Sequence, residues 1–166
     1  TSYMKFCENI LRLGVEIHPF NSFGFEYIKN DVPFFKIRNN EDKKILFLRH
    51  DVDHDPLLAL EMAKIEHSIA VRSTYFFLST DTLKPWMNSP ILKKKYFAVA
   101  KEIQSLGHEI GLHYDAIGDF LCEDVNPVEN IKETLSLFSE NQIHIVGCSA
   151  HGSYRTREIT STSYSL

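Results

Sequence analysis

Short apolar runs alternate along the chain with longer stretches that carry apolar residues at helical spacing. Residues 45–48 form the first such run and predict a buried strand. Asp55-Pro56 predicts the start of a helix, because aspartate caps helices and proline is favoured at the first helical position. The apolar stripe expected on this helix is Leu58, Met62, Ile65 and Ile69. The β-branched and aromatic residues 74–78 then predict a second strand.

The same pattern recurs twice towards the carboxyl end. Ser89-Pro90 predicts a second helix, which Gly107 would end, and residues 109–112 predict a strand. Asn126-Pro127 with Glu129 resembles a capping box that opens a third helix, followed by a strand over residues 143–146. The expected stripes of these helices are Leu92, Tyr96, Val99, Ile103 and Leu106 in one, and Val128, Ile131, Leu135 and Phe138 in the other.

The predicted order is therefore β-α-β-α-β-α-β, which makes right-handed parallel crossovers. We expect an α/β fold, either a doubly wound sheet or part of a barrel. The first 40 residues predict a helix near residues 3–13 and a phenylalanine-rich segment, 20–35, that would pack across one end of the core. The chain divides on this basis into an amino-terminal extension, residues 1–40, and a main α/β domain, residues 41–166.

Composition narrows the possible partners. The 166 residues suit one domain, and 18 basic against 22 acidic residues give a formal net charge of −4, which does not favour a nucleic-acid partner. Cys7, Cys122 and Cys148 are widely spaced, as is typical of reduced thiols in the cytoplasm. No stretch reaches the roughly 20 apolar residues of a membrane span.

Ionisable residues gather where the predicted strands end, the edge at which parallel α/β folds place their reactive groups. Asp51 and Asp53 stand two apart, so in an extended segment both point to one side and His50 to the other. Two carboxylates on one face repel each other unless a cation separates them, and a divalent metal is the simplest such cation. The alternative is that these aspartates cap the next helix, an interpretation that we favour for Asp55.

The other two strand ends carry histidines. His113 lies at the carboxyl edge, whereas His108 faces the opposite side of the strand and is expected to have a structural role. Asp115 has three open roles: orienting a ligand histidine, binding the metal, or starting the next loop. His151, next to Gly152, is either exposed to whatever binds at this edge or an ordinary solvated histidine.

Three segments together resemble the polysaccharide deacetylase family of carbohydrate esterases: Leu48-Arg49-His50-Asp51-Val52-Asp53, residues 72–77, and residues 107–113. The resemblance runs from about residue 45 to residue 155. It implies a deformed (β/α) barrel, of which this chain would hold a part, and metal-dependent removal of N- or O-acetyl groups from a carbohydrate. It also implies that Asp51 is the general base and that Asp53 and His113 are metal ligands.

The chain departs from that family at two places. Ile117 occupies the position of the second ligand histidine, and residues 150–155 stand in place of the family's third motif. We therefore expect His151 to complete the metal site and Arg155 to orient the base. The expected metal is zinc, with cobalt or another divalent ion as an alternative. His50, Tyr114 and Asp115 are expected to contact the sugar substrate.

Two other functions remain open. One is a non-catalytic sugar-binding domain, in which Trp86, Tyr75 and Tyr114 would stack on sugar rings. The other is a different metal-dependent hydrolase, such as a phosphoesterase.

Overall fold

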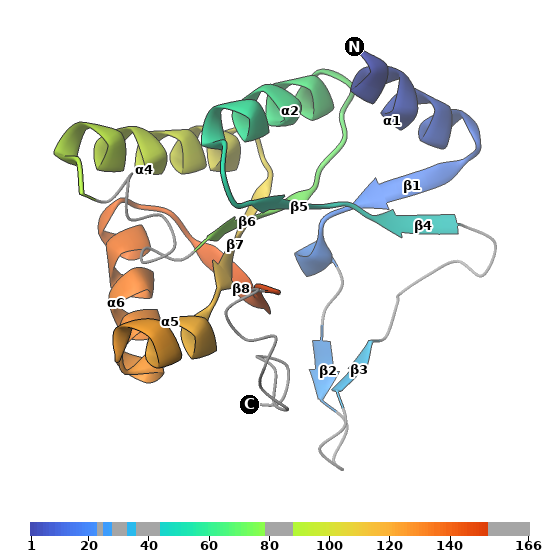
Figure 1. Cartoon of the computed structure of the whole chain (residues 1–166). Coiled ribbons are helices and arrows are strands. Elements are labelled where there is room, and N and C mark those ends of the chain that lie inside the picture. The colour runs from blue at the N-terminus through green and yellow to red at the C-terminus, as the bar shows by residue number, and fades with distance from the viewer. Residues whose placement is uncertain (23–24, 28–32, 36–43, 79–87, 153–166) are drawn as a thin grey trace.

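A parallel sheet lies at the centre of the molecule (Figure 1). The computed structural model describes residues 1–22, 25–27, 33–35, 44–78 and 88–152. Within these ranges the central strands are β5 (Arg49–Val52), β6 (Thr74–Leu78), β7 (Glu109–Tyr114) and β8 (Ile145–Ala150). They pair in the order β5-β6-β7-β8, every pair parallel, so the strand order follows the chain. The predicted α/β class with parallel strands is confirmed.

The chain before the central sheet adds a strand that the sequence analysis did not predict. β1 (Val15–His18) pairs in parallel with β4 (Lys44–Phe47). Leu48, between β4 and β5, donates its N–H to His18 and accepts from the N–H of Thr74, at 3.1 and 3.0 Å. β4 and β5 therefore follow each other directly in the chain, but they pair with different strands. β4 pairs with β1, and β5 pairs with β6. A short 3-10 helix, η1 (Phe20–Ser22), and an antiparallel pair, β2 (Phe25–Tyr27) and β3 (Pro33–Phe35), lie between β1 and β4 in sequence.

Three helices begin at the capping residues that the sequence predicted. Asp55 caps α2 (Pro56–Ser68), Ser89 caps α4 (Pro90–Ser105) and Asn126 caps α6 (Pro127–Glu140), each through its side chain. Gly107, at φ +89°, follows the end of α4, as predicted. α1 (Ser2–Arg12) matches the helix expected near residues 3–13, and α5 (Ala116–Glu123) was not predicted. Among the described helices, none is long and apolar enough to cross a membrane.

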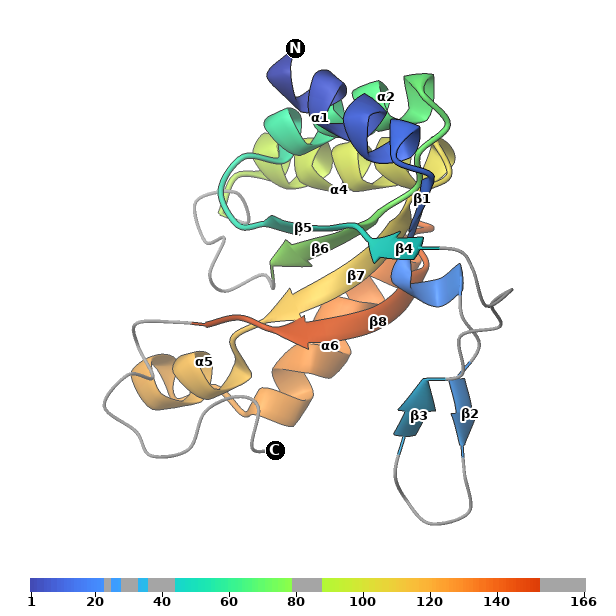
Figure 2. The same cartoon turned by 90° about the vertical axis from the view of Figure 1, so that its right-hand side faces the viewer.

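The core lies between the sheet and three of these helices. Figure 2 shows α2 and α4 above β5 and β6, and α6 behind β7 and β8. Alternate strand residues enter the core, among them Tyr75, Phe77, Ile110 and Leu112, and they meet Tyr96 and Ile103 of α4 and Phe138 of α6. The predicted stripe of α4 is therefore confirmed at its centre. The opposite face of the strands carries the residues of the candidate site.

The predicted stripes of α2 and α6 are partly wrong. Leu58 of α2 is 59% exposed, and the buried face is formed by two alanines, one leucine and one acid: Ala59, Leu60, Ala63 and Glu66. On α6, Val128 and Leu135 are exposed, whereas Asn130 and Thr134 are buried beside Phe138. Both helices bury polar side chains that are satisfied by hydrogen bonds, so counting large apolar residues points to the wrong face.

Candidate metal centre

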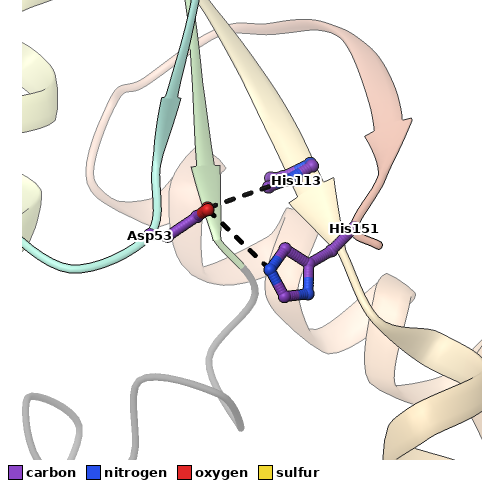
Figure 3. A group of neighbouring side chains, drawn as sticks. All are labelled: Asp53, His113 and His151. Carbon is purple, nitrogen blue, oxygen red and sulfur yellow. Dashed lines mark ion pairs between the residues drawn. The ribbon is translucent and has the colours of Figure 1, made fainter. Parts of the chain in front are cut away.

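Three side chains from distant parts of the chain meet at the carboxyl edge of the sheet (Figure 3). Asp53 directly follows β5, His113 lies near the end of β7, and His151 directly follows β8. The Nε2 atom of His113 is 3.7 Å from Oδ1 of Asp53, and the Nε2 atom of His151 is 3.8 Å from Oδ2. The two imidazole rings are perpendicular, with centroids 5.0 Å apart. All three residues that the sequence predicted as metal ligands are therefore brought together.

The donor set fits a divalent ion. One ligand atom from each residue lies within 4.8 Å of the others. Ligands that bind a tetrahedral zinc at about 2.0–2.1 Å are about 3.3 Å apart, so the three ligand atoms would have to move closer to one another to hold the ion. Oδ1 of Asp53 is buried and has no hydrogen-bond partner among the described residues. A buried acceptor without a partner costs about 1–3 kcal/mol, which a bound cation would offset.

His113 is already oriented as a ligand. Its Nδ1 atom lies 3.0 Å from the backbone carbonyl of Ser149, a position that assigns the proton to Nδ1 and leaves the lone pair of Nε2 facing Asp53. Burial lowers the pKa of His113, although the bond to Ser149 and the nearby carboxylates oppose that shift. The ring is therefore neutral near neutral pH, the form that binds metals.

His151 is held by contacts with the end of β7. Its backbone N–H donates to the carbonyl of Tyr114 at 2.8 Å, and its Nδ1 atom lies 3.9 Å from Oδ2 of Asp115. Asp115 is fully buried and caps α5 by accepting from the N–H of Gly118. The structure thus places Asp115 at the start of a helix, with its carboxylate facing the candidate ligand His151.

Asp51 lies beside the cluster with a partner that the sequence analysis missed. The guanidinium of Arg49 donates to both of its oxygens, from Nε at 2.7 Å and from Nη2 at 3.0 Å. Alternation along an extended strand puts residues two apart on one face, so the spacing of Arg49 and Asp51 was the available signal. Arg155, expected to orient this carboxylate, lies outside the described residues.

The side chains of other predicted site residues take different positions. The Nε2 atom of His50 is 2.6 Å from the buried carboxylate of Glu66, on the core side of β5. Tyr114 packs against the hydrophobic core, and Tyr75 is fully buried within it. Trp86 lies outside the described residues. The structure thus does not bring the rings of His50, Tyr75 and Tyr114 to the cluster, and contact of these residues with substrate stays a prediction.

His108 has the structural role expected of it. It is buried, and its ring nitrogens contact the backbone carbonyl of Ala63 at 3.0 Å and the N–H of Ser73 at 3.3 Å. These contacts tie α2 to the start of β6 on the core side of the sheet.

No protein-family model, curated protein or solved structure matches this chain.

A cleft beside the cluster gives room for a ligand. It has a volume of about 420 Å³ and runs along the end of β5 and the start of α2. Arg49, Asp51, Asp53 and His54 supply its polar wall, and Leu58 and Met62 line its apolar side. The cleft reaches the cluster at Asp53, and it also contains Asp51, a carboxylate that is 37% exposed and not needed for the three-residue donor set.

Proposed function

We propose that this chain carries the active site of a metal-dependent hydrolase that removes acetyl groups from a carbohydrate. The observation that carries the proposal is the donor set Asp53, His113 and His151, with Asp51 beside it and a cleft next to both. A divalent ion held there would polarise the acetyl carbonyl and acidify a water molecule. Zinc suits two imidazoles and a carboxylate, and cobalt is a close substitute.

Asp51 is the proposed general base. It would take the proton of the attacking water while the water oxygen bonds to the acetyl carbon. The bond from that carbon to the sugar nitrogen or oxygen would then break, and the leaving group would take up the proton that Asp51 accepted, which gives acetate and the free amine or alcohol. Arg49 holds both oxygens of Asp51, which fixes the carboxylate relative to the cleft.

The site and strand order support a barrel-type arrangement of the kind that the resemblance implies. Strands that pair in chain order, with crossover helices against one face, are the arrangement of a (β/α) barrel wall, whereas a doubly wound sheet reverses its strand order. The site lies at the carboxyl edge of the strands, where barrels place their catalytic groups. We therefore propose part of a deformed (β/α) barrel, and the cytoplasm as its location on the basis of the cysteine pattern.

The sugar-binding and phosphoesterase alternatives have less support from the contacts. Of the rings proposed to stack on sugars, Tyr75 lies in the core, Tyr114 packs against it, and Trp86 lies outside the described residues. A two-metal phosphoesterase needs ligands for a second ion. The only group of three or more suitable donors among the described residues is the one formed by Asp53, His113 and His151.

The test is release of acetate from N-acetylated chito-oligosaccharides and O-acetylated xylo-oligosaccharides by the protein loaded with zinc or cobalt. We expect turnover in at least one series, and Asp51→Asn should lower kcat by about 100-fold or more, because general-base catalysis typically contributes that factor. The variant should still bind the metal, since Asp51 is not in the donor set. Unchanged turnover in Asp51→Asn would show that this carboxylate is not the base.

A further inference from the structure

Two carboxylates are equally close to the same candidate ligand. The Nε2 atom of His113 is 3.7 Å from Oδ1 of Asp53 and 3.8 Å from Oδ2 of Asp51. Distance to His113 therefore does not decide which aspartate binds an ion. If both did, the cluster would hold four protein ligands and no base would remain beside it.

The two carboxylates differ in what already holds them. Both oxygens of Asp51 accept from the guanidinium of Arg49, in the fork geometry that makes arginine–carboxylate pairs strong. Oδ1 of Asp53, in contrast, is buried without a hydrogen-bond partner among the described residues. The carboxylate with an unused buried oxygen is the one that meets both histidines.

Arg49 is itself held in place by the neighbouring strands. Its Cζ atom lies 4.9 Å from the centroid of the Phe76 ring on β6, a cation–π contact. The Phe76 ring lies over Gly111 of β7, where an added Cβ atom would come within 2.5 Å of the ring. Because β7 has no side chain at this position, the ring can lie flat under the guanidinium. The orientation of Arg49 is thus built into three adjacent strands.

We propose that Arg49 selects the metal ligand: by holding both oxygens of Asp51 it keeps this carboxylate off the ion and leaves Asp53, His113 and His151 as the donor set. The inference rests on the proposed metal site, and it makes Arg49 a positioning residue. Without the guanidinium, Asp51 can turn towards the ion as a fourth protein ligand. Metal affinity would then rise while the base would be lost.

The experiment measures Co²⁺ affinity, by competition with a chelator, and the visible absorption of the Co²⁺ complex. Four proteins form a cycle: the unchanged chain, Arg49→Met, Asp51→Asn and the double variant. Removing a positive charge near a cation tightens binding in both backgrounds. Residue 51 can bind the ion as a fourth ligand only if it is a carboxylate. We therefore expect the gain in Co²⁺ affinity caused by Arg49→Met to be about tenfold larger when residue 51 is Asp than when it is Asn. The visible bands should change only when Asp51 is present.

Arg49→Lys separates geometry from charge, because lysine keeps the charge but cannot make two parallel bonds. It should show part of the same Asp51-dependent gain and spectral change, whereas Arg12→Met, which removes a charge on α1, should show neither. Equal gains in both backgrounds with unchanged visible bands would overturn the role of Arg49 while leaving the metal site intact. Failure of the unchanged chain to bind Co²⁺ would overturn the metal site and this inference with it.

Discussion

The carboxylate of Glu66 is buried on the core side of the sheet. It has no exposed side-chain surface and accepts from the hydroxyls of Tyr3, Ser73 and Tyr75 as well as contacting His50. Burial raises the pKa of Glu66, but His50 and the hydroxyl donors outweigh this and hold the pKa below its usual range. An ionised glutamate thus joins α1, α2, β5 and β6 behind the strand that carries Asp51 and Asp53.

Glu66→Gln should destabilise the protein by about 3 kcal/mol, because the amide replaces an acceptor oxygen of a buried carboxylate with a donor and leaves hydroxyls that bond to it without an acceptor. The matched control is Glu61→Gln on the same helix, where the carboxylate is exposed and its contact with Lys64 spans 3.6 Å. That change should cost less than about 0.5 kcal/mol. Urea denaturation monitored by circular dichroism measures both, and equal midpoints would contradict the importance of this buried group.

At the scale of elements, capping signals were more informative than apolar periodicity. Helices α2, α4 and α6 begin at the predicted Asp55, Ser89 and Asn126, because a side-chain cap is a local interaction that the sequence states directly. The stripe of α6 could not be predicted in the same way. Its buried face includes Asn130, whose amide donates to Asp119 of α5 at 3.0 Å, a contact between two helices that no periodicity reveals.

The strands show the same division between local and distant information. β6 and β7 were predicted from their composition, whereas β1, with its alternating Val15-Glu16-Ile17-His18, was missed although the alternation was a usable signal. The candidate ligands were predicted because each lies at the end of a strand. The pairing of Arg49 with Asp51 was missed although their spacing was a usable signal. The support of Arg49 by the Phe76 ring, which lies over Gly111, joins separate strands and is not visible in the sequence.

Gly111→Ala tests how tightly these strands fit. The added Cβ atom would meet the Phe76 ring at 2.5 Å, so we expect a loss of about 1–3 kcal/mol in the free energy of unfolding. Gly147 on the neighbouring strand has nothing within 4 Å of the corresponding position, and Gly147→Ala should change stability by less than about 0.5 kcal/mol. Thermal and urea denaturation compare the two. Similar losses in both variants would show that the contact with Phe76 is not the cause.

In the molecule as a whole, parallel winding is what assembles the site. Asp53, His113 and His151 are far apart in sequence, but each lies at or just after the carboxyl end of a strand in one sheet. The same winding buries His108 on the opposite face, beside Glu66 and close to the chain before β6.

Stability should fall as the pH drops below about 6.5. Burial lowers the pKa of His108 from its ordinary value of 6.5, although Glu66 opposes the shift. Between the lowered and the ordinary pKa the unfolded chain binds more protons than the folded one, so stability is present above this window and is lost as the pH falls through it. Glu66, whose pKa is also lowered, adds a further loss below its ordinary value of 4.5.

Urea denaturation of the metal-free protein at a series of values from about pH 8 to about pH 5 would measure this dependence. His108→Gln should flatten the loss between the ordinary and the lowered pKa, and His144→Gln, at an exposed position, should leave it unchanged. An unchanged slope in His108→Gln would assign the loss to other groups, of which His113 in the cluster is the first to test, because burial lowers its pKa too.

The most direct test of the account is the stoichiometry and affinity of zinc binding, measured by elemental analysis after dialysis and by chelator competition. We predict one zinc per chain in the unchanged protein, with near-complete loss in His113→Ala, His151→Ala and Asp53→Ala, and retention in Asp51→Asn and in His144→Ala as a control. Folding of each variant would be verified by circular dichroism. Zinc uptake that is absent from the unchanged chain, or equal in the three ligand variants and the control, would contradict a metal centre at this edge of the sheet.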